Sequence, residues 1–362
     1  MVLVLFWTGR EDLDFPDPNN PTDDTATIQS LVTGAEAQMR SGFGVYIRDL
    51  LVVGREAYYL EPADPRYTGE LLRGPIDGGG FLCYTPWAAN YKVIKNCQTI
   101  INSPDADAGA IGFAKTVQAY CLMRVLNLTD TNGARTNYDG VIATAIATKA
   151  ETLAEIEALL DAGSTSLAAA GSAFSFTLSS GFDGFNTPST FDHFNRGLRA
   201  RAAVLQDDWS AAQTALTAIA DWMNADANVG VYHVFSSGAN DGDNQMYEDP
   251  NAATLKLMVH PTFLTDADSG DARVTNNVLV RTETITYDFL ESYLAPTLYN
   301  SSYDPVPMMR AEELKLLQAE VHIGNSNFSG AEGILNTLRT AAGVADYTGT
   351  DASNAVDRVL HE

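Results

Sequence analysis

The sequence predicts a mostly α-helical protein in which pairs of helices stack into a scaffold, joined to an irregular, loop-rich lobe with a few short strands. The clearest pair lies between Pro307 and Gly343, where apolar residues recur every three or four positions and give each arm one buried face. Residues Gly324 to Asn327 supply the break between the arms. The apolar positions are Leu314, Leu317 and Val321 on the first arm and Ala331, Ile334, Leu335 and Leu338 on the second.

Further helix pairs are expected upstream of this hairpin. One comprises Phe194 to Gln206 and Trp209 to Met223, and another falls within residues 111–160. The pairs are similar to tetratricopeptide-type units, which cannot bury their apolar faces alone and must therefore stack. Long inserts separate the pairs in this chain, so we expect a superhelical scaffold that departs from a regular solenoid.

The remaining elements are assigned from local patterns. Thr22 and Asp23 are suited to start a first helix. Other helices are expected at Trp87 to Ile101 and Ile111 to Asn127. Residues 54–80 mix aromatic residues with Gly and Pro and predict a long surface excursion. Alternating β-branched and aromatic residues predict short strands at Phe174 to Leu178, Val231 to Phe235 and Val278 to Thr286.

Composition excludes several classes of protein. The 362 residues are 45% hydrophobic, which is enough to bury a large core. The formal charge of −24 would repel a phosphate backbone, so nucleic acid is excluded as a partner. Three cysteines are too few and too unevenly spaced for a disulfide framework or a zinc site. We expect Cys97 and Cys121 to be buried packing residues.

No catalytic constellation stands out in the sequence. The five histidines fall at no metal-ligand spacing, and neither a nucleophile motif nor a phosphate loop is present. Asp271 and Arg273 are interpreted as a salt bridge that fixes a loop. We expect no cofactor, although an acidic loop leaves weakly bound calcium open as an alternative to a solvated loop. Its residues are Asp241, Asp243, Asn244, Glu248 and Asp249.

The helical hairpin resembles the SusD/RagB family of outer-membrane nutrient-binding lipoproteins. In that family a Pro, an Arg-x-x-Glu helix, an Ala-Glu pair and an Asn-x-x-Arg-x-x-x-Gly ending occur in this order. Here the matching residues are Pro307, Arg310, Glu313, Ala319, Glu320, Asn336, Arg339 and Gly343. The acidic, Pro- and Asn-rich stretch Asp12 to Pro21 is similar to the tether that follows the lipid-modified cysteine in the family, but that cysteine is missing here.

The resemblance implies a single SusD-like domain over residues 22–362, preceded by a signal remnant and tether over residues 1–21. It further implies a non-enzymatic protein at the bacterial cell surface that captures oligosaccharides and delivers them to a SusC-like TonB-dependent outer-membrane transporter. Relatives are held at the outer membrane by a lipid anchor. Because relatives continue beyond the amphipathic pattern at residues 359–362, we expect this sequence to be incomplete at its C-terminus.

Aromatic residues indicate where a sugar would bind, because sugar rings pack on aromatic faces while their hydroxyl groups need amides and carboxylates. Trp87 opens a helix, which favours burial, and Trp209 and Trp222 are expected in the core. The resemblance places the region around residues 54–87 on the ligand face. The candidate ligand-binding residues are Arg55, Tyr58, Tyr59, Arg66, Tyr67, Tyr84 and Trp87.

Three alternatives remain open at this stage. A peptide-binding lid of such a transporter would use the same scaffold, and a protein-interaction scaffold would bind partners through a helical groove. A glycoside hydrolase would need two carboxylates that face each other across a cleft. Asp and Glu are so abundant in this sequence that their presence does not discriminate between these functions.

Overall fold

The computed structural model describes residues 26–138, 144–239 and 241–362. The predicted tether over residues 1–21 and the expected helix start at Thr22 and Asp23 lie outside the described residues. The first described helix is α1 (Ile28–Met39), and the Thr27 side chain caps it by accepting a hydrogen bond from the Ser30 backbone N–H.

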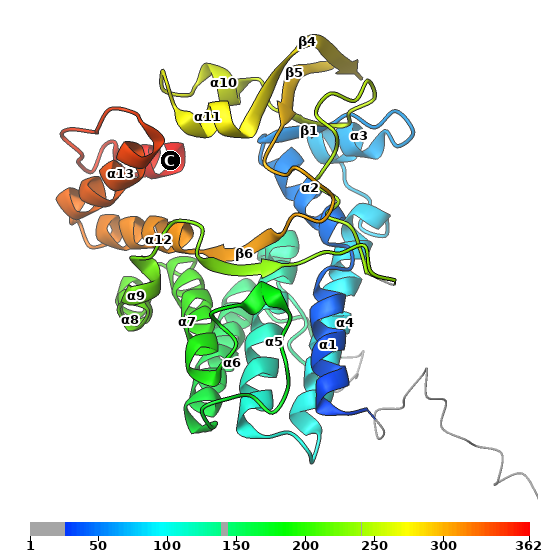
Figure 1. The fold of residues 1–362 in the computed structure, drawn as a ribbon, viewed down its shortest axis with the longest axis vertical. Coiled ribbons are helices and arrows are strands. Elements are labelled where there is room, and N and C mark those ends of the chain that lie inside the picture. Colours follow the sequence, from blue (N-terminus) through cyan, green and yellow to red (C-terminus); the bar gives the residue numbers. More distant parts are fainter. Residues whose placement is uncertain (1–25, 139–143, 240) are drawn as a thin grey trace, which may run out of the picture.

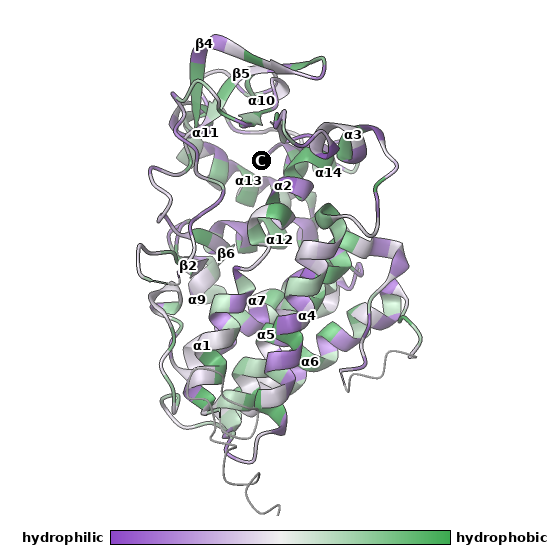
Figure 2. Cartoon of the chain, turned by 90° about the vertical axis from the view of Figure 1, so that its right-hand side faces the viewer, coloured by the Kyte–Doolittle hydropathy of each residue, from purple (hydrophilic) through white to green (hydrophobic). Residues whose placement is uncertain are grey.

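The lower half of the molecule in Figure 1 is a bundle of long helices. From α4 to α9 each helix packs on the next, and α1 packs on α4. Hydrophilic and hydrophobic residues lie side by side along α1, α4 and α6 (Figure 2), as expected of helices with one face in solvent. The remaining helices are α4 (Phe81–Asn102), α5 (Ala108–Thr129), α6 (Lys149–Ala169), α7 (Pro188–Val204), α8 (Trp209–Ala218) and α9 (Ala220–Met223).

The predicted C-terminal hairpin is confirmed as α12 (Ala311–Gly324) and α13 (Phe328–Ala342). Helix α12 packs on α7, α8 and α9, so the hairpin continues the stack of helices. The expected helix from Trp209 to Met223 is instead interrupted at Ile219, which separates α8 from α9. A last short helix, α14 (Ala355–His361), packs against both α12 and α13.

The upper half in Figure 1 is a lobe of short helices with the sheets β1–β3 and β4–β5, whereas β2 and β6 lie across the top of the bundle and share its core. Strand β1 pairs with β3, β2 with β6 and β4 with β5, all antiparallel. The strands are β1 (Ala57–Tyr59), β2 (Gly230–His233), β3 (Leu257–Val259), β4 (Val278–Tyr287), β5 (Leu290–Pro296) and β6 (Val306–Arg310). The helices are α2 (Phe43–Val53), α3 (Arg66–Arg73), α10 (Thr262–Thr265) and α11 (Ala272–Asn277). The architecture is therefore mostly helical with a few short strands, as predicted.

Two local predictions are wrong. Residues 54–80 are not simply an irregular excursion, because they contain β1 and α3, and β1 finds its partner β3 some 200 residues further along the chain. Phe174 to Leu178 forms no strand. The Gln29 side chain bonds both the backbone N–H and the carbonyl of Thr177. The phenylalanine rings of the segment pack on α5 and α7, and Phe176 lies 5.6 Å from Phe113.

Other predictions about packing are confirmed. Cys97 and Cys121 are fully buried, and burial raises the pKa of both thiols. Trp222 is buried, and Trp209 packs against the same core. The Asp271–Arg273 pair forms with 2.7 Å between the Arg273 Nη2 and the Asp271 Oδ2, and Asp271 also caps α11.

A bidentate ion pair joins α7 to the C-terminal hairpin. Arg201 donates from Nε and Nη2 to the two carboxylate oxygens of Glu313 at 2.7 and 2.8 Å, and Nη2 also reaches the Met308 carbonyl at 3.2 Å. The Arg201 side chain is mostly buried. Removing Glu313 would therefore leave a largely desolvated cation without its carboxylate.

We expect Glu313→Ala to lower the free energy of unfolding by about 2–3 kcal/mol. Glu312→Ala is the matched control, because Glu312 lies on the same helix turn but makes a single local contact with Arg310. The control is expected to cost less than about 1 kcal/mol. Urea unfolding followed by circular dichroism measures both values, and equal losses would contradict a special role for the Arg201–Glu313 pair.

Candidate functional site

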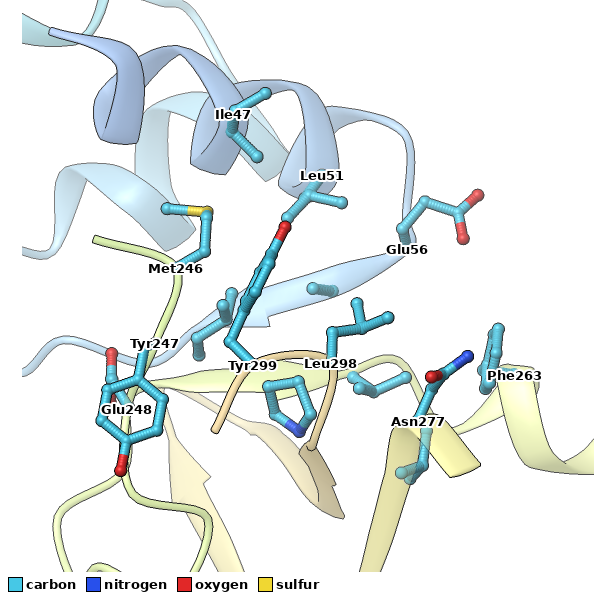
Figure 3. Close-up of a pocket in the computed structure, with 15 residues that line it drawn as sticks. Ile47, Leu51, Glu56, Met246, Tyr247, Glu248, Phe263, Asn277, Leu298 and Tyr299 are labelled. Carbon is cyan, nitrogen blue, oxygen red and sulfur yellow. The ribbon is translucent and has the colours of Figure 1, made fainter. Parts of the chain in front are cut away.

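Helix α2 separates two cavities. Asp49, Leu50 and Val53 line one of them, and Ile47 and Leu51 line the other. The spacing follows the helical repeat, so the two sets of residues lie on different faces of α2. We call the first the α2–α4 cleft; its volume is about 590 Å³ and its walls come from α2, α3, α4 and the end of α5. We call the second the apolar cavity; its volume is about 380 Å³ (Figure 3).

Two aromatic side chains of α4 line the α2–α4 cleft. Tyr84 is 60% exposed although it is a large aromatic residue. Trp87 lies one helical turn further on and is half-buried, with its ring 4.6 Å from that of Tyr91. Exposed and half-buried rings side by side in a concave site provide apolar faces for a ligand.

Asp49 is the single carboxylate among the residues that line the cleft. The side chain is buried, and its Oδ1 has no hydrogen-bond partner within the described part of the chain. Burial raises the pKa of Asp49 to about 7, and the charge of Arg48 opposes this shift only in part. The Arg48 guanidinium donates instead to the hydroxyl of Tyr59 at 2.8 Å. A buried acceptor without a partner is costly, so a rotation of the Asp49 side chain that brings this oxygen to a donor group of a ligand in the cleft would be favoured.

Polar groups from the end of α5 complete the cleft. Asn127 uses its Nδ2 to donate to the Tyr46 hydroxyl at 3.0 Å, which fixes the orientation of its amide. Asn132 is exposed in the short 3-10 turn that follows the helix, and Thr129 lies between them. The cleft thus combines aromatic faces, a carboxylate and planar amides.

The structure divides the predicted ligand-binding residues among different places. Tyr84 and Trp87 line the α2–α4 cleft together. Tyr59 and Tyr67 are buried against each other with ring centroids 4.5 Å apart, in a core beside α2. Tyr58 points the other way along β1 and packs on His260 at 4.8 Å. These three tyrosines are enclosed by the pairing of β1 with β3, so they support the fold and have little surface to offer a ligand.

The two predicted arginines also lie apart. Arg66 forms an exposed ion pair with Asp64 and covers the ring of Phe81 at 4.3 Å. Arg55 is exposed and lines a third hollow, a charged groove of about 550 Å³ between the α2–β1 turn, α10, α11 and the C-terminal residues. Asp49 and Asn127 were not predicted as binding residues. The charged residues Arg48 and Asp49 inside the otherwise apolar run Tyr46 to Val53 were the available signal for Asp49.

Most side chains of the acidic loop form hydrogen bonds or ion pairs with other residues of the protein. Asp241 pairs with Arg40, and Glu248 accepts a hydrogen bond from the Lys256 backbone N–H at 2.7 Å. Asn244 is buried and donates to the Asp304 carbonyl. Over the described ranges, no group of three or more His, Cys, Asp or Glu side chains is arranged to hold a metal ion. Calcium at this loop stays an untested prediction.

The sequence itself matches no protein-family model and no curated protein. Solved structures with the same fold exist. A SusD-like carbohydrate-binding protein from Bacteroides fragilis matches with a TM-score of 0.70 at 12% identity, over 92% of this chain and 82% of that one. Surface glycan-binding protein A from Bacteroides uniformis matches with a TM-score of 0.66 at 13% identity, over 92% and 84%. A SusD-like carbohydrate-binding protein from Bacteroides vulgatus gives 0.64 at 14%, over 92% and 79%.

These matches extend over nearly the whole described chain. Because the sequence identities are low, the matches establish the fold alone. The chain has the SusD-like fold, as the resemblance of its C-terminal hairpin predicted. Within residues 26–138, 144–239 and 241–362, no helix has both the length and the hydropathy needed to cross a bilayer.

Proposed function

We propose that this protein binds oligosaccharides in the α2–α4 cleft. The observation that carries the proposal is the exposed ring of Tyr84 beside Trp87, in the same cleft as a buried carboxylate with an unpartnered oxygen. Aromatic faces pack on the C–H faces of sugar rings, and Asp49, Asn127 and Asn132 supply acceptors and donors for hydroxyl groups. The names of the structures with the same fold, which describe carbohydrate and glycan binding, support this assignment.

We further propose that binding serves nutrient uptake at the cell surface. In this proposal the protein lies over a SusC-like TonB-dependent transporter of the outer membrane and delivers its ligand there without cleaving it. Membrane attachment would use a lipid anchor, as the family resemblance implies. We propose that capture needs no cofactor.

The alternatives differ in what the cleft must contain. A glycoside hydrolase needs a pair of carboxylates, and the described residues lining the α2–α4 cleft include only Asp49. A peptide-binding lid or a protein-interaction scaffold would not require an exposed ring next to an unpartnered carboxylate. The geometry therefore favours sugar capture over all three alternatives.

The first test is a binding screen of the full chain against arrayed oligosaccharides, with mass spectrometry of every bound ligand. Binding of an intact oligosaccharide supports the proposal. Cleavage of the ligand would show a hydrolase, and a folded sample that binds peptides but no glycan would show the peptide-binding alternative.

Tyr84→Ala is expected to weaken binding of the best glycan by about 1–2 kcal/mol, because the variant removes an exposed ring from the cleft. Tyr303→Ala is the matched control, since Tyr303 is 46% exposed and lines none of the three hollows. Isothermal titration calorimetry measures both affinities. Equal affinities for the two variants would place the binding site outside the cleft.

A further inference from the structure

The apolar cavity on the other face of α2 has a lining suited to a different ligand. Its walls are formed by aliphatic and aromatic side chains from α2, β3, α10 and the segment after β5. Figure 3 shows Tyr299 in the middle of the cavity, with its ring extending towards Leu51 and Leu298 beside it. The principal apolar residues are Ile47, Leu51, Leu257, Phe263, Leu298 and Tyr299. Sugar hydroxyl groups would find few partners on such walls, whereas a hydrocarbon group would gain from burial.

The charged residues that line the cavity are both acidic. Glu56 and Glu248 contribute carboxylates, and no Lys, Arg or His is among the described lining residues. Glu248 accepts one hydrogen bond from the Lys256 backbone, while the Glu56 carboxylate has neither an ion pair nor a hydrogen bond to another described residue. Lys256, which precedes the lining residue Leu257 in the sequence, is paired with Glu61. The cavity is therefore complementary to a cation and repels an anion.

The mouth of the cavity is defined by two residues. Glu56 and Phe263 line both the apolar cavity and the charged groove, so the two hollows meet there. Phe263 is 37% exposed and Leu298 is 60% exposed, which leaves hydrocarbon surface open at the entrance. A ligand with its hydrocarbon chain inside would hold its polar end close to Glu56. Arg55 and Arg273 line the groove rather than the cavity, and Arg273 is paired with Asp271 and Glu362.

We propose that the apolar cavity is a second binding site, which takes a primary amine that carries an aliphatic or aromatic chain. The chain fills the cavity and the ammonium group pairs with Glu56 at the mouth. The volume of about 380 Å³ is at the small end of the range for ligand pockets and suits one short chain. This site is independent of the α2–α4 cleft, because α2 lies between them and none of the residues lining the one lines the other.

The test is calorimetric titration of the full chain with butylamine, hexylamine and octylamine. Burial of each added methylene group is worth about 0.8 kcal/mol, so affinity is expected to rise about fourfold per methylene until the cavity is full. Octanoate has the same number of carbon atoms as octylamine and the opposite charge, and it should bind at least tenfold more weakly than octylamine. Absence of a chain-length dependence, or equal binding of octanoate, would overturn the proposal.

Two variants locate the site. Leu298→Arg places a cation at the exposed entrance and should reduce octylamine affinity at least tenfold, and Glu56→Gln should reduce the preference for octylamine over octanoate. Val280→Arg is the matched control, because Val280 is 54% exposed on β4 and lines none of the three hollows. If Leu298→Arg and Val280→Arg bind octylamine equally well, the amine binds elsewhere. If no amine binds to the folded chain, the proposal is wrong, and the cavity is better explained as a pocket that binds an apolar side chain of a partner protein.

Discussion

Phe191→Ala is expected to lower the free energy of unfolding by about 3–5 kcal/mol. Phe191 is fully buried in α7 and lies within 5.5–5.8 Å, between ring centroids, of four other phenylalanines. Those rings come from α5, from α7 itself and from the segment between α6 and α7: they are Phe113, Phe174, Phe182 and Phe194. Truncation opens a cavity among aromatic rings that cannot collapse around it, because three separate segments hold them in place.

Phe289→Ala provides the control for this loss. Phe289 is fully exposed at the turn between β4 and β5, so its truncation is expected to change stability by less than about 0.5 kcal/mol. Chemical unfolding followed by tryptophan fluorescence compares the two variants. A similar midpoint for Phe191→Ala and Phe289→Ala would mean that the phenylalanine cluster does not hold the helices together.

The sequence predicted the helices whose apolar repeat and ends can both be recognised locally. The arms α12 and α13 have a clear three- and four-residue repeat, and both helices and their break were found. Helix α2 was missed. Its residues Phe43–Val53 follow Gly42, which has no side chain to cap the helix, and no acidic residue lies in its first turn. Without these start signals the segment could not be recognised as a separate helix.

The candidate site was predicted only in part, for a related reason. Tyr84 and Trp87 were found because they are close together on one helix. Tyr58, Tyr59 and Tyr67 have the same local pattern, but the pairing of β1 with β3 encloses them, and this contact between distant segments is invisible in the local sequence. Asp49 and Asn127 join the cleft from α2 and α5, so no motif connects them.

Glycan binding in the α2–α4 cleft is expected to strengthen as the pH rises through about 7. Burial raises the pKa of Asp49 to about 7, so below this pH its carboxyl group is protonated and no longer a charged acceptor. A sugar hydroxyl that donates to the carboxylate stabilises the ionised form, and the bound protein therefore has a lower Asp49 pKa than the free protein. By linkage, affinity should rise by up to about tenfold per pH unit between those two pKa values and level off above about 7.

Asp49→Asn should remove this pH dependence and weaken binding at pH 8 by about 1.5–3 kcal/mol, the range for a hydrogen bond to a charged group. The stability of the free protein should depend on pH in the opposite sense to the affinity. Because folding raises the pKa of Asp49, the free energy of unfolding falls as the pH rises from about 4 to 7. Removing the buried charge should therefore not lower the denaturant midpoint of unfolding at pH 8. Weaker binding without loss of stability would thus separate a direct role of Asp49 from unfolding.

Glu36→Gln is the matched control for the pH effect. Burial also raises the pKa of Glu36 to about 7, but this α1 side chain accepts a hydrogen bond from the backbone N–H of Ser179 and does not line the cleft. The variant should alter the pH dependence of stability and leave that of glycan binding unchanged. Calorimetric titrations between pH 5.5 and 8 compare the three proteins. If the pH dependence of binding survives in Asp49→Asn but is lost in Glu36→Gln, the ligand does not contact Asp49, and the cleft must be replaced as the proposed site.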